Sequence, residues 1–168
     1  MTSIYHRLIS PFVVLLMTST VALGSVGEIG KIRGSGVLER EGNVIVGSNG
    51  VGVQSMDTAV TAKGTMQIDF IDQTRVDITE HSRLLIDEFV YDPNTQTGAL
   101  SLKASLGTVR YASGQIAKNS KQNVKISTPT ATIAVRGTDF AMTIDELGSS
   151  TIILLPSCNT LGKCYVGE

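Results

Sequence analysis

The residues of this chain whose types suit catalysis are few and scattered. His81 lies in a polar turn, with Asp77 and Asp87 near it in sequence, so a serine hydrolase is the first chemistry to consider. No serine stands in a Gly-x-Ser-x-Gly elbow, the strained turn that exposes the nucleophile of many such enzymes. We therefore expect His81 to be an exposed turn residue, and we expect no catalytic site.

Metal and cofactor chemistry also lacks its usual patterns. Calcium would need hard oxygen ligands, for which four aspartates are candidates: Asp69, Asp72, Asp77 and Asp87. They alternate with apolar residues, as on the solvated face of strands, and they lack the spacing of a calcium loop. The glycine-rich stretch 27–52 is not followed by Lys-Ser/Thr or by a helical pattern, so it is no phosphate loop. We expect no metal and no cofactor.

The N-terminal residues have the pattern of an export signal. His6 and Arg7 precede an apolar run over 8–23, and Ala22-Leu23-Gly24 places small residues at a cleavage site. The run is interrupted by Ser, Thr and Pro and falls short of the roughly 20 apolar residues that span a bilayer. We predict a signal peptide at 1–24, a mature domain at 25–168, no stable membrane span and a periplasmic or secreted location. The alternative is an uncut run that tethers the domain to the membrane.

Charge and cysteine content fit an exported domain. Cleavage would leave 13 basic against 15 acidic residues, a net charge of −2, with the basic residues scattered singly. Phosphate backbones need a clustered basic surface, so we expect no nucleic-acid binding. Cys158 and Cys164 flank a turn-like segment, and we expect a disulfide between them, because exported proteins form such bonds. Two thiolates alone do not complete a tetrahedral zinc site.

Composition and periodicity predict an all-β domain. Hydrophobic residues make up 42% of the chain, charged residues 17%, and glycine is abundant, while Trp is absent. Segments with a period of two recur about every 8 to 12 residues between turn residues, a spacing typical of antiparallel folds. The prediction is one domain of many short strands in a rolled sheet, a sandwich or a loosely coiled β-solenoid. A short helix is expected only around 115–121.

The segment 128–140, TPTATIAVRGTDF, is the most informative stretch. Alternating apolar residues before and after it predict a strand, a tight break at Gly137 and another strand. The break presents Arg136, Gly137, Thr138 and Asp139 at a corner. Gly137 permits a positive φ, and Arg136 has donors for nearby carbonyls or for Asp139. Such a corner either fixes the backbone or offers a contact surface, since arginine is favoured at interfaces.

The same segment resembles the signature of the FecR-like periplasmic domain almost position for position, from its Thr-Pro pair through Val-Arg-Gly-Thr to the acidic residue and Phe. Two further segments, FIDQTRV (70–76) and IDEFVYDP (86–93), are similar to other parts of that family. The resemblance spans about 57–155. It implies an extracytoplasmic, β-rich sensing or interaction module with no known chemistry of its own.

In the best-known arrangement of that family, a cytoplasmic anti-sigma segment and one transmembrane helix precede the module, which relays a signal from an outer-membrane receptor to a sigma factor. Here only residues 1–7 precede the apolar run, too few to bind a sigma factor, so we expect a stand-alone exported form. We predict that it binds a protein or an envelope glycan through sheet and loop surfaces. A membrane-tethered signalling component and a structural piece of a larger surface assembly are the alternatives; the sequence specifies no oligomeric state.

Overall fold

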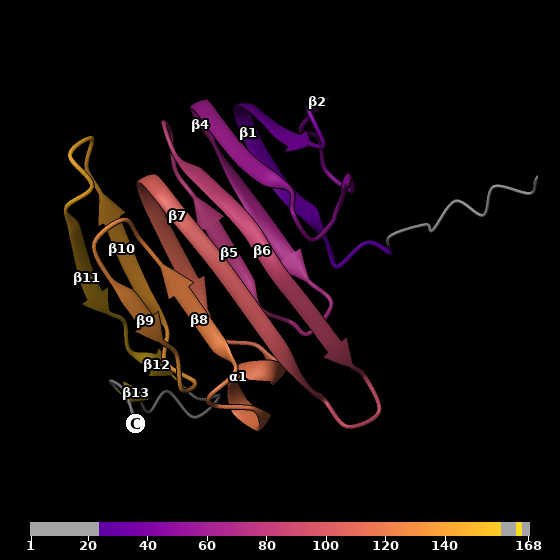
Figure 1. Ribbon diagram of the computed structural model, residues 1–168, viewed down its shortest axis with the longest axis vertical. Coiled ribbons are helices and arrows are strands. Elements are labelled where there is room, and N and C mark those ends of the chain that lie inside the picture. Colours follow the sequence, from indigo (N-terminus) through magenta and orange to yellow (C-terminus); the bar gives the residue numbers. More distant parts are fainter. Residues whose placement is uncertain (1–23, 159–163, 166–168) are drawn as a thin grey trace, which may run out of the picture.

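Alternation of apolar and polar residues produces long strands in the part of the chain that the structure describes, residues 24–158 and 164–165. In this computed structural model the longest are β1 (Gly27–Arg40), β4 (Thr58–Phe70), β6 (Arg83–Asp92) and β7 (Thr97–Ala112) (Figure 1). Buried and exposed residues alternate along most of each strand, as expected when one face covers a core. Residues 1–23 of the predicted signal peptide lie outside the described range.

Ten shorter elements complete the described structure. They are β2 (Asn43–Val46), β3 (Gly52–Val53), β5 (Arg75–Ile78), α1 (Gln115–Asn119), β8 (Val124–Ser127), β9 (Thr132–Ala134), β10 (Phe140–Ile144), β11 (Ser150–Leu154), β12 (Ser157–Cys158) and β13 (Cys164–Tyr165). The all-β prediction is confirmed, and α1 is the short helix expected around 115–121. No helix among residues 24–158 and 164–165 is long and apolar enough to cross a membrane.

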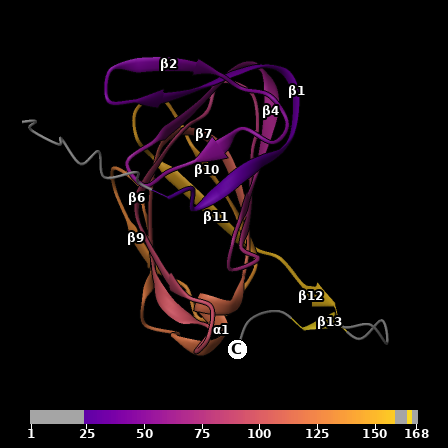
Figure 2. The same cartoon turned by 90° about the vertical axis from the view of Figure 1, so that its right-hand side faces the viewer.

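Four strands close a ring. One half of β4 pairs with β5 and the other half with β6, while β7 pairs with both β5 and β6. The strands β4, β5, β7 and β6 therefore form a small closed barrel, which agrees with the rolled-sheet arrangement (Figure 2). All the described pairings are antiparallel except that of β7 with β8, so the fold is not a solenoid of parallel coils.

Apolar side chains fill the space inside the sheet. The ring of Phe70 stacks on Phe89, and that of Tyr111 stacks on Phe140, both with centroids 5.4 Å apart. Aliphatic residues from every long strand, such as Leu38, Ile68 and Leu102, are fully buried around these rings. Burial of each such side chain contributes roughly 1.5–3 kcal/mol, so the core is the main source of stability.

The sheet divides into two branches beyond the barrel. From one half of β7 it continues through β10 to β11, and from the other half through β8 to β9. The two branches lie in different layers (Figure 2). Within the described residues, β9 and β11 each pair with one neighbour only, so both end in a free edge. This open side carries the signature segment.

An ion pair between Arg40 and the buried Asp57 links the N-terminal strands. The carboxylate of Asp57, which is fully buried, accepts two hydrogen bonds from the Arg40 guanidinium, each 2.7 Å. The same guanidinium donates to the carbonyl of Gly52, and the backbone N–H of Gln54 donates to Asp57. The three bonds from Arg40 connect β1 to β3 and to the segment that leads into β4, and the fourth orders that segment.

Candidate functional site

The predicted tight turn at Gly137 is confirmed. β9 ends at Ala134, β10 begins at Phe140, and Gly137 between them has a φ of +85°. Val135 is buried and its N–H donates to the carbonyl of Val124 at 3.0 Å, which anchors the chain just before the turn. The positive φ explains the glycine, because side chains with a Cβ adopt that conformation only at a cost.

The two charged residues of the turn behave differently. The carboxylate of Asp139 accepts a hydrogen bond of 2.8 Å from the backbone N–H of Ser113, whose hydroxyl donates to the carbonyl of Thr138 at 3.1 Å. Arg136 is exposed and makes no hydrogen bond or ion pair with the described residues. The described part of the structure shows neither of the bonds considered for Arg136, to Asp139 or to nearby carbonyls; Asp139 bonds Ser113 instead.

Segment 70–76, the second stretch that is similar to the family, lies close to the turn at 136–139. Asp72 accepts hydrogen bonds from the N–H of Thr74 at 3.0 Å, from the Thr74 hydroxyl at 2.8 Å and from the N–H of Ile116 at 3.2 Å. The first of these is a local turn bond, from the backbone N–H two residues further along the chain to the Asp72 side chain. The third fixes the start of α1, although the two residues are 44 positions apart.

Tyr111 lies between these two sets of bonds. Burial raises the pKa of Tyr111, and the nearby side chains of Thr74 and Ser113 offset this only in part. Its hydroxyl is buried and has no hydrogen bond of normal geometry in the described structure. We call the group Asp72, Thr74, Tyr111, Ser113 and Asp139 the junction. Its carboxylates have backbone partners and its phenol stays protonated, so the junction holds segments together and has no poised nucleophile.

The remaining candidate aspartates have separate roles. Asp69 pairs with Arg75 and Asp87 pairs with Lys103, each at 2.7 Å, while burial raises the pKa of Asp77. The prediction that all four aspartates lie on a solvated face is wrong for Asp72. Asp72 is fully buried, because its carboxylate accepts hydrogen bonds from Thr74 and Ile116. Among residues 24–158 and 164–165, no three His, Cys, Asp or Glu side chains gather as a metal site would require.

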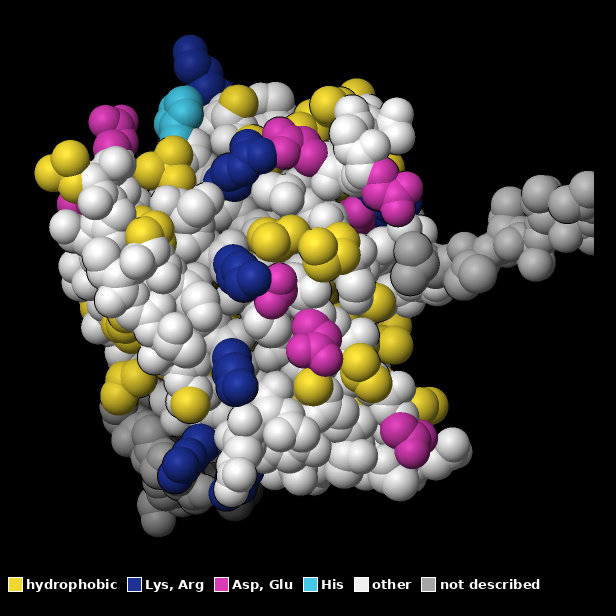
Figure 3. Space-filling view, viewed as in Figure 1, with side chains coloured by type: hydrophobic (Ala, Val, Ile, Leu, Met, Phe, Trp, Pro, Cys, Tyr) yellow, Lys and Arg dark blue, Asp and Glu magenta, His cyan; other side chains and the backbone are white. Residues whose placement is uncertain are grey.

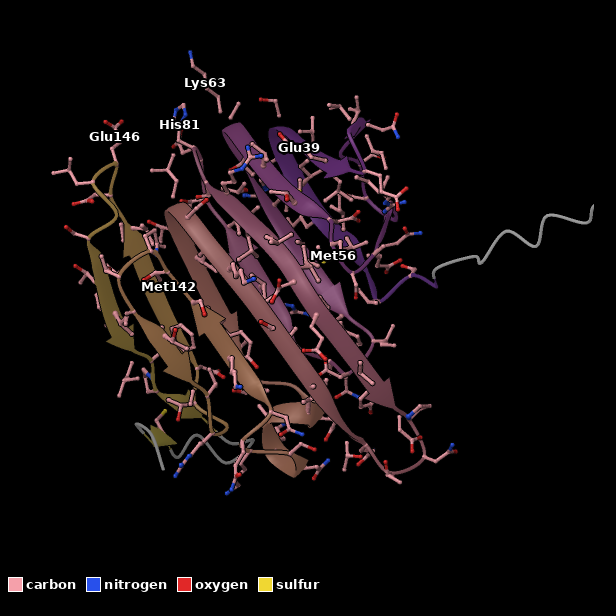
Figure 4. The ribbon with its side chains drawn as sticks, in the orientation of Figure 1. Glu39, Met56, Lys63, His81, Met142 and Glu146 are labelled. Atoms are coloured by element: carbon pink, nitrogen blue, oxygen red, sulfur yellow. The ribbon has the colours of Figure 1, made fainter. Side chains whose placement is uncertain are left out.

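His81 and the cysteine segment lie far apart. His81 is exposed in a turn with a φ of +53°, beside Lys63 at one end of the molecule (Figure 4). β12 and β13 bring Cys158 and Cys164 to facing positions in their register. The disulfide between them stays a prediction.

The signature also joins the two branches of the sheet at one point. The turn at 128–131 is closed by a bond of 2.8 Å from the N–H of Thr128 to the carbonyl of Ala131. From this turn Thr130 donates to the carbonyl of Gly148, and Ser150, at the start of β11, donates to the Thr128 hydroxyl. These bonds hold β11 near β9 at one end only.

Further along, an apolar hollow of about 160 Å³ separates β9 from β10 and β11. We call it the β9–β11 groove, and its lining residues are Ile133, Ala134, Val135, Arg136, Thr138, Phe140, Ile152 and Leu154. In Figure 3 hydrophobic side chains are spread over the whole face drawn, this side included, among basic and acidic ones. A wider hollow lies near Ser25, where Gly27, Gly52 and Asp69 are among its lining residues.

Comparison with protein-family models identifies the chain. The model described as FecR protein matches residues 57–155, which is more than half of the sequence. The chain belongs to the FecR protein family. Comparisons with curated proteins and with solved structures give no match. The FecR match begins at the buried Asp57 and ends just after β11, so it includes both the junction and the β9–β11 groove.

Sequence reasoning found part of this site and missed the rest. The corner at 136–139 was found through its strand–turn–strand pattern. The contribution of Ser113 was missed, because its backbone N–H is the group that bonds Asp139 and a backbone donor leaves no trace in sequence. The groove was missed because Ile152 and Leu154 have the alternation of any half-buried strand. One signal was available: residues 147–162 contain no charged residue, which is unusual for an exposed edge.

Proposed function

We propose that this FecR-family chain is an exported, non-enzymatic interaction module that recognises a protein, with the turn at 136–139 and the β9–β11 groove as its contact surface. Arg136 is the observation that carries the proposal. Asp139 and Thr138 of this turn accept hydrogen bonds from Ser113, whereas Arg136 is exposed at the rim of an apolar hollow. Arginine beside apolar surface is a frequent composition of protein interfaces.

The exposed apolar side chains are of a type that favours a protein partner over a glycan. The large hydrophobic residues that are exposed among the described ones are all aliphatic or methionine. Sugar rings are usually held by flat aromatic side chains, whereas aliphatic edge residues suit contacts with another polypeptide. The regulatory character of the FecR family supports a binding role in signalling, and the proposal includes no chemical step.

Capture of envelope proteins tests this function. The mature chain and its Arg136→Ala and Lys63→Ala variants are used as bait against envelope extracts of the host. Lys63 is a matched control, since it is also an exposed cation but lies at the other end of the molecule (Figure 4). We expect a partner that is lost or weakened with Arg136→Ala and retained with Lys63→Ala. An identical set of partners for all three baits would contradict a contact at Arg136.

Export is proposed on the N-terminal pattern alone. Mass spectrometry of the protein recovered from its host gives the mature N-terminus. Ser25 as the first residue supports release of the domain into the periplasm or medium. An intact Met1 in a membrane fraction would instead support the membrane-tethered signalling component.

A further inference from the structure

β11 has an inner face that the rest of the sheet does not cover. In its register with β10, Leu154 faces Phe140 and Ile152 faces Met142. Facing residues in antiparallel strands point to the same side of the sheet, and Phe140 and Met142 are buried in the core. Ile152 and Leu154 therefore point inward, yet they are 39% and 53% exposed.

The exposure arises from the lengths of the two branches. β9 has three residues and β11 has five, so β9 cannot cover the inner face of β11 along its whole length. The 128–131 turn contacts β11 only at its start, through Ser150. The result is the β9–β11 groove, which opens between two free strand edges.

The edge of β11 also lacks the usual protection against pairing. Edge strands in soluble proteins commonly carry charges, prolines or bulges that block a further strand. β11 has none of these within its five residues, and its outer-face residue Ile153 is 60% exposed. Apolar residues on both faces and a free edge are the requirements for strand addition, in which backbone hydrogen bonds provide affinity and alternate side chains enter pockets.

Charge indicates what kind of strand would fit. Residues 147–162 contribute no charge, and Arg136 is the charged residue that lines the groove. It makes no ion pair with the described residues and is exposed at the end of the groove near Leu154. A strand lying in the groove would therefore gain from a carboxylate placed against Arg136. A second copy of β11 has no carboxylate within the strand itself to offer.

We propose that an extended segment of a partner protein, with apolar residues at alternate positions and a carboxylate near one end, adds as a strand to the edge of β11 and fills the β9–β11 groove. This inference rests on the proposed function and specifies its partner. The apolar residues of the added strand would cover Ile152 and Leu154, and its carboxylate would pair with Arg136.

Selection from a random library of twelve-residue peptides on the mature chain tests this inference. We expect selected peptides with alternating apolar residues and an Asp or Glu near one end. Synthetic copies should bind the Leu154→Ser variant about tenfold more weakly, since about 1.4 kcal/mol of apolar contact is lost. They should bind Arg136→Gln about threefold more weakly, because an exposed ion pair contributes little.

Two controls separate strand addition from loose apolar contact. Val44→Ser alters another exposed apolar residue, on the edge strand β2, and should leave affinity unchanged. Alternate amides of the added peptide face β11, and the amides between them face away. N-methylation of the amides that face β11 should abolish binding, whereas N-methylation of the other set should have little effect. Thermal unfolding of each protein variant shows whether its fold is intact before affinity is interpreted.

Four outcomes would overturn the inference. Peptides that bind Leu154→Ser as well as the unaltered chain would place recognition elsewhere. Peptides lost only with Val44→Ser would place peptide recognition at β2 instead of the β9–β11 groove. Concentration-dependent dimers that Leu154→Ser dissociates would make a second copy the occupant. If no peptide is selected, the inference fails, whereas the proposed function is decided separately by the envelope capture with Arg136→Ala.

Discussion

Removal of the Asp72 carboxylate should unfold the domain more readily than removal of any other aspartate of the predicted calcium set. Asp72 is fully buried and accepts three hydrogen bonds, from two groups of Thr74 and from the N–H of Ile116. In Asp72→Ala these donors lose their acceptor inside the protein. A buried donor without a partner costs about 1–3 kcal/mol. Rotation of the hydroxyl and entry of water reduce the sum, so we expect a loss of about 3–5 kcal/mol.

Such a loss is a large part of the 5–15 kcal/mol that stabilises a typical domain. Equilibrium unfolding in urea measures it, and the melting temperature should fall by roughly 10 °C for a domain of this size. Asp87→Ala is the matched control, because Asp87 is a partly exposed strand residue paired with Lys103 and Ser101. Its loss should stay within about 1 kcal/mol. Equal effects of the two substitutions, or a loss below 1 kcal/mol for Asp72→Ala, would refute the role of the junction.

Three further predictions follow from single features. Gly137→Ala should lower the free energy of unfolding by about 1–2 kcal/mol, because the position has a positive φ. Gly137→Asn should lower it less, since asparagine adopts this conformation more readily. Equal losses for the two variants would contradict this reason. Burial raises the pKa of Asp77 in the folded state. The ionised carboxylate therefore destabilises the fold above that pKa, whereas below the unfolded-state pKa near 4 the side chain is neutral in both states and has no such effect. Asp77→Asn should raise the melting temperature at pH 7 and leave it unchanged at pH 3. The intact mass of the non-reduced protein should be lower than that of the reduced protein by two hydrogens if Cys158 and Cys164 are bonded, and equal masses would exclude the disulfide.

Local features of the fold could be predicted because local sequence determines them. Alternation with a period of two predicts the strands, and Gly137 predicts the break before β10. In each case the residues that interact are within a few positions of one another. The same holds for α1, which fills the only stretch expected to be helical.

Features that depend on distant pairing could not be predicted. The burial of Asp72 requires Ile116, and the bond of Asp139 requires Ser113, 26 positions away. The barrel closes because β4 and β7 each pair with different strands along their two halves, which alternation does not reveal. The β9–β11 groove depends on the short length of β9 and on the parallel pairing of β7 with β8.

We propose that the side of the molecule carrying Arg136 contacts a protein in the envelope. Photo-crosslinking in the host tests this contact, with a benzophenone amino acid placed either at Arg136 or at His81, which is also exposed but lies at the other end of the molecule (Figure 4). We expect a discrete crosslinked protein band from position 136 and none from position 81. The same band from both positions, or from position 81 alone, would contradict it.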